Sequence, residues 1–151
     1  MLSGWQDTPL DSAFYYGAGE TGTWGFRTPW MGWNKNNYSM KMFGNVAANY
    51  TTGIETRSSC DTLFLLGALS ADRKTGCLLA TDYRGDRNVL AVDVSGMDRA
   101  EVSAVILDAA NDLVPVPVER EGRTLLLRKN GCGSAAFLLT FRRPETDGGV
   151  K

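Results

Sequence analysis

The spacing of hydrophobic positions along the chain changes near residue 50. Before that point, large apolar side chains recur at three- and four-residue steps, which places them on one face of a helix. The members of this stripe are Tyr38, Met42, Phe43, Val46 and Tyr50. The spacing predicts a helix over residues 35–49. Asn34 is the expected N-cap, because its side chain can accept a hydrogen bond from the first unpaired amides of the helix.

After residue 51, apolar and polar residues alternate with a period of two, which is typical of β-strands. The predicted strands are residues 53–57, 62–70, 76–83, 88–94, 101–108, 113–119, 123–128 and 135–141. Polar and glycine-containing turn segments separate them, as in antiparallel sheets. In the strand over residues 88–94, Leu90 and Val92 should face the core while Ala91 and Asp93 face solvent, which gives a sheet with one wet face.

The fold class is therefore mainly β: an antiparallel eight-stranded β-sandwich, with an aromatic-rich strand and loop and one α-helix before it. Residues 1–50 form an N-terminal arm, in which residues 13–16 are a predicted strand and residues 17–25 a glycine-rich loop. Residues 51–143 form the sandwich, and the polar residues 144–151 form a tail that we expect to be disordered. The arm is too small to be a domain, so it either packs on the sandwich or is part of a larger protein.

Composition narrows the function classes. The chain has 151 residues, of which 43% are hydrophobic and 22% charged, as in a globular domain. With a net charge of −1, the chain lacks the excess of positive charge that would attract nucleic acid or an anionic membrane. No apolar run is long enough to cross a bilayer, and no signal peptide is visible, so a cytoplasmic location is the default expectation.

This sequence lacks the residue type that most often serves as a general base or as a neutral metal ligand. It contains no histidine, which excludes a Ser-His-Asp or Cys-His site within the chain. Cys60, Cys77 and Cys132 fit no zinc or redox spacing, and we expect Cys77 and Cys132 to be small core residues. Asp82, Asp86, Asp93 and Asp98 lie near hairpin ends, but their spacing fits no calcium loop. The sequence thus predicts neither a metal nor a cofactor.

Two large aromatics of the strand region, Phe64 and Phe137, lie in apolar runs and are predicted to belong to the core. Only Tyr83 and Phe141 remain as other large aromatics among the strands. A sandwich that binds sugar on its sheet needs an exposed aromatic platform. This scarcity weighs against a sugar site on the strands themselves.

The order of these pieces resembles a known family. Residues 38–44, with the sequence YSMKMFG, resemble the last barrel helix of clan A glycoside hydrolases, and residues 14–16 and 22–26 would be the strand and loop before it. Residues 63–69 and 76–83 resemble a hairpin of the accessory sandwich in such enzymes, and residues 92–96 and 105–108 resemble its next strands. The resemblance is to the β-xylosidase/α-iduronidase-like family, and it covers residues 13–141.

This resemblance implies the last strand, loop and helix of a (β/α)₈ barrel followed by a β-sandwich. It also implies that this chain is not an enzyme by itself, because the two catalytic glutamates of that clan lie before anything present here. No catalytic residue is carried over. Glu20 follows the predicted strand, but glycoside hydrolysis needs a second carboxyl group at a defined separation. The better interpretation of Glu20 is a solvated loop residue.

The candidate substrate-binding residues are Trp24, Trp30 and Trp33. Sugar rings stack on aromatic faces, and loops that follow barrel strands form the rim of an active site. The alternative is that these side chains cover the junction between the barrel and the sandwich or fill a local core.

The resulting hypothesis is a non-catalytic C-terminal β-sandwich region of a glycoside hydrolase. It would brace the catalytic barrel domain of the parent protein and contribute aromatic contacts to carbohydrate. The alternatives are a freestanding carbohydrate-binding sandwich and a protein-interaction sandwich. Because a chain that ends inside a barrel leaves apolar surface exposed, we also expect a homodimer through the N-terminal arm.

Overall fold

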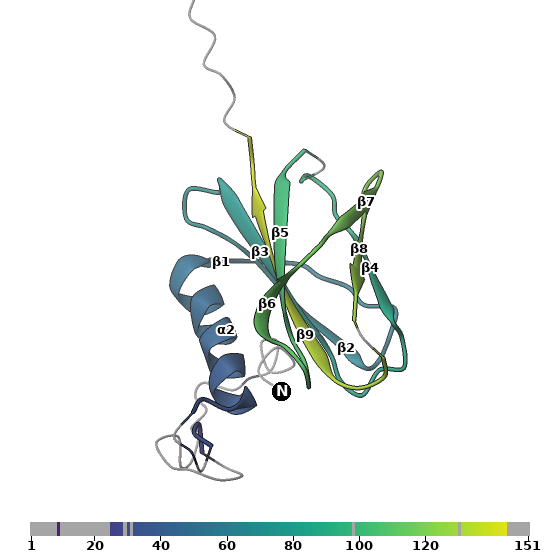
Figure 1. Ribbon diagram of the computed structural model, residues 1–151. Coiled ribbons are helices and arrows are strands. Elements are labelled where there is room, and N and C mark those ends of the chain that lie inside the picture. Colours follow the sequence, from purple (N-terminus) through teal and green to yellow (C-terminus); the bar gives the residue numbers. More distant parts are fainter. Residues whose placement is uncertain are drawn as a thin grey trace, which may run out of the picture.

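The computed structural model describes Pro9 and residues 25–28, 30, 32–97, 99–129 and 131–144. These residues form three layers: one helix, a six-stranded sheet and a three-stranded sheet (Figure 1). The strands are β1 (Thr52–Ile54), β2 (Leu63–Leu69), β3 (Thr75–Asp82), β4 (Val89–Asp93), β5 (Glu101–Leu107), β6 (Asp112–Val116), β7 (Glu119–Glu121), β8 (Thr124–Arg128) and β9 (Ala135–Arg142). The predicted strand at residues 13–16, the loop at residues 17–24 and most of the predicted tail lie outside the described residues.

The helix α2 (Lys35–Asn49) has the predicted bounds, and the Asn34 side chain accepts from the Asn37 amide as the predicted N-cap. Met42 and Val46 are each 3% exposed. They pack on the six-stranded sheet, where they join Cys77, Leu79 and other side chains in one cluster. Among the described residues, no helix combines the length and the apolar character needed to cross a membrane.

The six-stranded sheet has the order β1-β2-β3-β9-β5-β6, and every neighbouring pair is antiparallel. Both of its faces are covered, because α2 lies on one face and the three-stranded sheet β4-β8-β7 on the other. This explains why β3 and β9 are almost continuously apolar, whereas β4 alternates between exposed and half-buried positions. The predicted orientation of β4 is confirmed.

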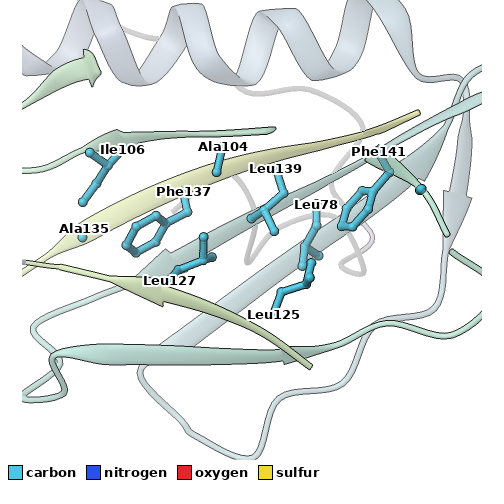
Figure 2. Close-up of a cluster of buried hydrophobic side chains, with 10 residues drawn as sticks. Leu78, Ala104, Ile106, Leu125, Leu127, Ala135, Phe137, Leu139 and Phe141 are labelled. Carbon is cyan, nitrogen blue, oxygen red and sulfur yellow. The ribbon is translucent and has the colours of Figure 1, made fainter. Parts of the chain in front are cut away.

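The main core lies between the two sheets. Alternate residues of β9, including Phe137 and Leu139, meet Leu125 and Leu127 of β8 (Figure 2). Phe137 is 1% exposed, so its predicted core position is confirmed. The neighbouring residue Leu138 faces the other way and packs in the cluster under α2. One strand thus serves two cores because successive side chains point to opposite faces.

The structure corrects the number of strands in the sandwich. Residues 113–119, predicted as one strand, belong to two strands in different sheets, so the described chain has nine strands and not eight. The chain crosses from β6 to β7 through Pro117, which has no N–H for a sheet ladder. Leu113, near the start of β6, adopts a left-handed backbone with φ of 58°.

Two predicted core residues are in fact exposed. Phe64 lies near the start of β2, is 37% exposed, and is not part of the cluster that Leu66 and Ala68 join beneath α2. Cys132 is exposed because it lies in the turn between β8 and β9, where Gly131 and Gly133 have positive φ, and not in a strand. Cys77 is buried as predicted.

Candidate functional site

A short loop before α2 carries two of the three predicted sugar-contacting tryptophans. Arg27 and Trp33 form an isolated antiparallel bridge. The Thr28 amide donates to the Gly32 carbonyl at 2.7 Å, and the Gly32 amide donates to the Thr28 hydroxyl at 3.1 Å. These bonds bring Arg27 and Thr28 next to Gly32 and Trp33, and we call residues 27–33 the Trp30 loop.

The Trp30 loop presents its aromatic rings to solvent. Trp30 is 91% exposed and Trp33 is 51% exposed. The guanidinium carbon of Arg27 lies 4.5 Å from the centre of the Trp33 ring, which is a cation–π contact. Exposed indole rings of this kind can stack on the C–H faces of sugars. Trp24, the third predicted residue, lies outside the described residues.

Asn34 connects this loop to the helix. Its side-chain oxygen caps α2 through the Asn37 amide at 3.2 Å, while its side-chain nitrogen donates to the Gly25 carbonyl at 2.6 Å. The Asn34 amide also donates to the Phe26 carbonyl. One side chain therefore sets both the start of the helix and the base of the Trp30 loop.

Lys35 connects the start of α2 to the sandwich. Its ammonium group donates to the Asn111 carbonyl at 3.0 Å and to the Asp112 carboxylate at 2.5 Å. The two ion-pair partners are 77 positions apart in sequence. Because both side chains are about half exposed, the ion pair alone stabilises the contact only weakly. It adds to the buried contacts that Met42 and Val46 make further along the helix.

The Trp30 loop has two exposed indole rings on which a ligand can stack, and one cationic side chain, Arg27. Glu20, the carboxylate nearest to this loop in the predicted strand–loop unit, lies outside the described residues. Over the residues that the structure describes, no group of three or more His, Cys, Asp or Glu side chains could hold a metal ion.

Sequence reasoning missed a buried ion pair between the last residue of β3 and the residue that follows β8. The Lys129 ammonium, which is almost fully buried, donates to the Asp82 carboxylate at 2.6 Å and to the Gly85 and Gly133 carbonyls at 2.9 and 2.7 Å. It thus connects the end of β3 to the loops after β3 and β8. Only the unusual position of a lysine next to an apolar strand could have signalled it.

This ion pair continues into a chain of hydrogen bonds. Thr62 donates to the other Asp82 oxygen at 3.2 Å, and the Cys60 sulfur lies 3.1 Å from the Thr62 hydroxyl. Hydrogen bonding from the Thr62 hydroxyl and from the Thr62 backbone amide, with a smaller contribution from Arg87, lowers the pKa of the Cys60 thiol. A small cavity beside the pair is lined by Leu63, Asp82, Arg87, Val89, Leu90, Lys129 and Phe137. The cavity has room for about one water molecule, so it is no sugar site.

Comparison with known proteins shows which solved structures have a similar fold. No protein-family model and no curated protein matches the chain. It is similar to the GH30 endoxylanase from Clostridium papyrosolvens C71, with a TM-score of 0.61 and 10% identity over 79% of this chain and 30% of that chain. It is also similar to Xyn30A, a subfamily 8 GH30 xylanase from Clostridium acetobutylicum, with a TM-score of 0.60 and 10% identity over 78% and 31% of the two chains.

The described chain thus spans less than a third of the length of either xylanase. At 10% identity the likeness concerns the fold, and it confirms at that level the resemblance to clan A glycoside hydrolases. The chain has the fold of one part of the GH30 xylanases.

Proposed function

We propose that this chain is the non-catalytic β-sandwich region of a glycoside hydrolase and that it braces the catalytic barrel of its parent protein. The observation that carries the proposal is the fold likeness to about 30% of each GH30 xylanase chain. The packing of α2 supports it. A helix that resembles the last barrel helix is fastened to the large sheet by Met42, Val46 and Lys35, so a barrel that includes this helix would be joined to the sandwich through a buried contact.

The same proposal gives the Trp30 loop a role at the rim of the active site. Trp30 and Trp33 would stack on a polysaccharide, and by analogy with the similar structures xylan is the substrate to test first. The cation–π contact with Arg27 restricts the Trp33 ring and so reduces the entropy that is lost on binding. Trp24 stays a predicted sugar contact that lies outside the described residues.

The first experiment measures the native gene product by immunoblot in its source cells. A band several times larger than 16.4 kDa is expected, and activity on xylan and other glycosides should then be found with the whole protein and not with the 151-residue chain. A band near 16.4 kDa, or hydrolysis by the chain alone, would overturn the proposal.

The bracing role can be tested separately in the longer protein. Val46→Ala removes two methyl groups beneath α2, whereas Asn45→Ala changes an exposed side chain of the same helix. If the sandwich braces the barrel, Val46→Ala lowers the temperature at which glycosidase activity is lost and Asn45→Ala does not. Equal inactivation temperatures for both variants and the wild type would contradict bracing.

The exposure of Trp30 and Trp33 also favours a second candidate, a freestanding carbohydrate-binding module. The isolated chain would then bind xylan in affinity electrophoresis, and the Trp30→Ala/Trp33→Ala variant would not. Absence of binding by the wild-type chain favours the bracing role. The control Phe64→Ala removes an exposed aromatic from β2, remote in sequence from the loop, and should leave any such binding unchanged.

A further inference from the structure

Four strands lie at the edges of the two described sheets, and three of them carry features that hinder further pairing. β1 and β7 have only three residues each, and β7 is wholly charged. β6 contains Pro115 and a left-handed residue, Leu113. β4 has neither proline nor lysine over its five residues, Val89–Asp93, and four of them are apolar. Long apolar edges without such protection are templates for pairing with another strand.

The hydrogen bonds around β4 show which backbone groups remain available. The Lys129 amide donates to the Asn88 carbonyl, and the Val94 amide donates to the Arg123 carbonyl. Because bonded and non-bonded pairs alternate in an antiparallel ladder, the even-numbered residues of β4 bond to β8. The N–H and C=O groups of Val89, Ala91 and Asp93 therefore point away from β8. Within the described part of the chain they form no hydrogen bond, and the connection over residues 55–62 forms none with β4.

We infer that this edge pairs with β4 of a second copy of the chain, in an antiparallel arrangement whose two-fold axis passes between the two Ala91 residues. In this register Val89 lies opposite Asp93 of the other copy, so the three outward backbone positions of each copy bond to one another. A six-stranded sheet results from two three-stranded sheets, and the contact is isologous, as in most dimers.

The side chains of β4 suit a second copy. The exposed Arg87, which precedes β4 and also contributes to the lowered pKa of Cys60, would lie diagonally across from Asp93 of the other copy, within reach of a long side chain. Symmetry forms this ion pair twice. On the inner face, Leu90 of each copy lies opposite Val92 of the other. Both are only half-buried in one copy, so pairing removes further apolar surface from water.

A charge exchange tests the partner and the register together. Arg87→Asp and Asp93→Arg each place like charges across the axis, so each variant alone should dimerise at least about tenfold more weakly than the wild type in sedimentation equilibrium. An equimolar mixture of the two variants restores opposite charges and should form a heterodimer of near wild-type affinity. Failure of the mixture to associate when the wild type dimerises would overturn the register.

A second pair of variants tests the edge itself. Ala91→Lys places two lysines opposite each other on the axis, whereas Leu126→Lys places a lysine on the same face in β8, which is the central strand of the three-stranded sheet. Only Ala91→Lys should abolish the dimer, and circular dichroism verifies that both variants remain folded. A wild-type chain that is monomeric up to millimolar concentration, or equal weakening by both lysines, would overturn the proposal. The proposal would also be overturned if β4 paired only with a different protein and not with a second copy of the chain.

Discussion

At the scale of single residues, the most deeply buried ion pair in the described part of the chain joins Lys129 to Asp82. Burial of a charge is costly unless it is paired and hydrogen-bonded, and here the ammonium group has three oxygen acceptors. The backbone fits tightly around the pair, since a Cβ at Gly85 would lie 2.1 Å from the Asp82 carboxylate oxygens. Glycine is required at this position to let the loop after β3 approach the buried ion pair.

We expect Lys129→Met to destabilise the chain by about 3–5 kcal/mol, because the substitution leaves the Asp82 carboxylate buried without its cation. The free energy of unfolding from urea titration measures this loss. Arg128→Ala is the matched control, since Arg128 is adjacent in sequence but pairs with Glu119 on the exposed face. A Lys129→Met variant as stable as the Arg128→Ala variant would show that the buried ion pair contributes little.

The cysteines should differ in reactivity. Burial raises the pKa of the Cys77 thiol to about 11, so almost no thiolate forms there at neutral pH. The hydrogen bond to Thr62 lowers the pKa of Cys60, so its thiolate fraction at pH 7 exceeds that of an ordinary thiol. Brief iodoacetamide treatment followed by mass spectrometry should label Cys60 and the exposed Cys132 in the native protein and Cys77 only after unfolding.

The pH dependence of this labelling gives an internal check. Because the Cys60 pKa is lowered, the alkylation rate of Cys60 in the wild type should begin to rise at a lower pH than in the Thr62→Val variant, which lacks the hydroxyl. Identical rate profiles for the wild type and Thr62→Val would contradict the assigned cause.

At the scale of elements, the start of α2 is fixed by Asn34, which acts through two different atoms. Its oxygen caps the helix, and its nitrogen holds the carbonyl of Gly25. The position of the Trp30 loop is therefore coupled to helix initiation, although the loop and the helix are separate elements.

Substitutions of Asn34 should separate these two contributions. Asn34→Asp keeps the capping oxygen but loses the donor to Gly25, whereas Asn34→Ala loses both. We expect the loss of the cap to cost about 1 kcal/mol, so thermal unfolding should rank the wild type above Asn34→Asp and Asn34→Asp above Asn34→Ala. A reversed order of the two variants would show that the capping bond is not the main contribution of this side chain.

At the scale of the whole molecule, the six-stranded sheet lies between two different coverings. One face packs on the three-stranded sheet through Phe137 and Leu139, and the other packs on α2 through Leu138. Both cores contain side chains of β3 and β9. Loss of one core would therefore expose one face of strands whose other face packs in the second core. We therefore expect the helix and the sandwich to unfold in a single transition.

Met42→Ala tests this cooperativity. The substitution leaves a cavity beneath α2 and should destabilise the entire chain by about 2–5 kcal/mol, because Met42 is 3% exposed. Circular dichroism of the helix and amide exchange in β8 should report the same loss of stability. Lys41→Ala, at an exposed position of the same helix, is the control. If only the helix signal shifted in Met42→Ala, α2 would be an independent attachment.

The sequence by itself determined the bounds and cap of α2, the alternation in β4 and the mainly β class, because these depend on local periodicity and local hydrogen bonding. It also placed Trp30 and Trp33 in a loop, but their exposure and the position of Arg27 follow from the bonds that close that loop.

Only the tertiary structure decided how distant segments combine. It divided residues 113–119 between two sheets, because the pattern of apolar residues does not state which partner strand each half receives. It left Phe64 exposed, although its apolar run predicts burial, because coverage of a sheet face depends on where the helix lies. It brought Lys129 and Asp82 together from positions 47 residues apart. Such contacts depend on the chain's path in space, which local periodicity does not specify.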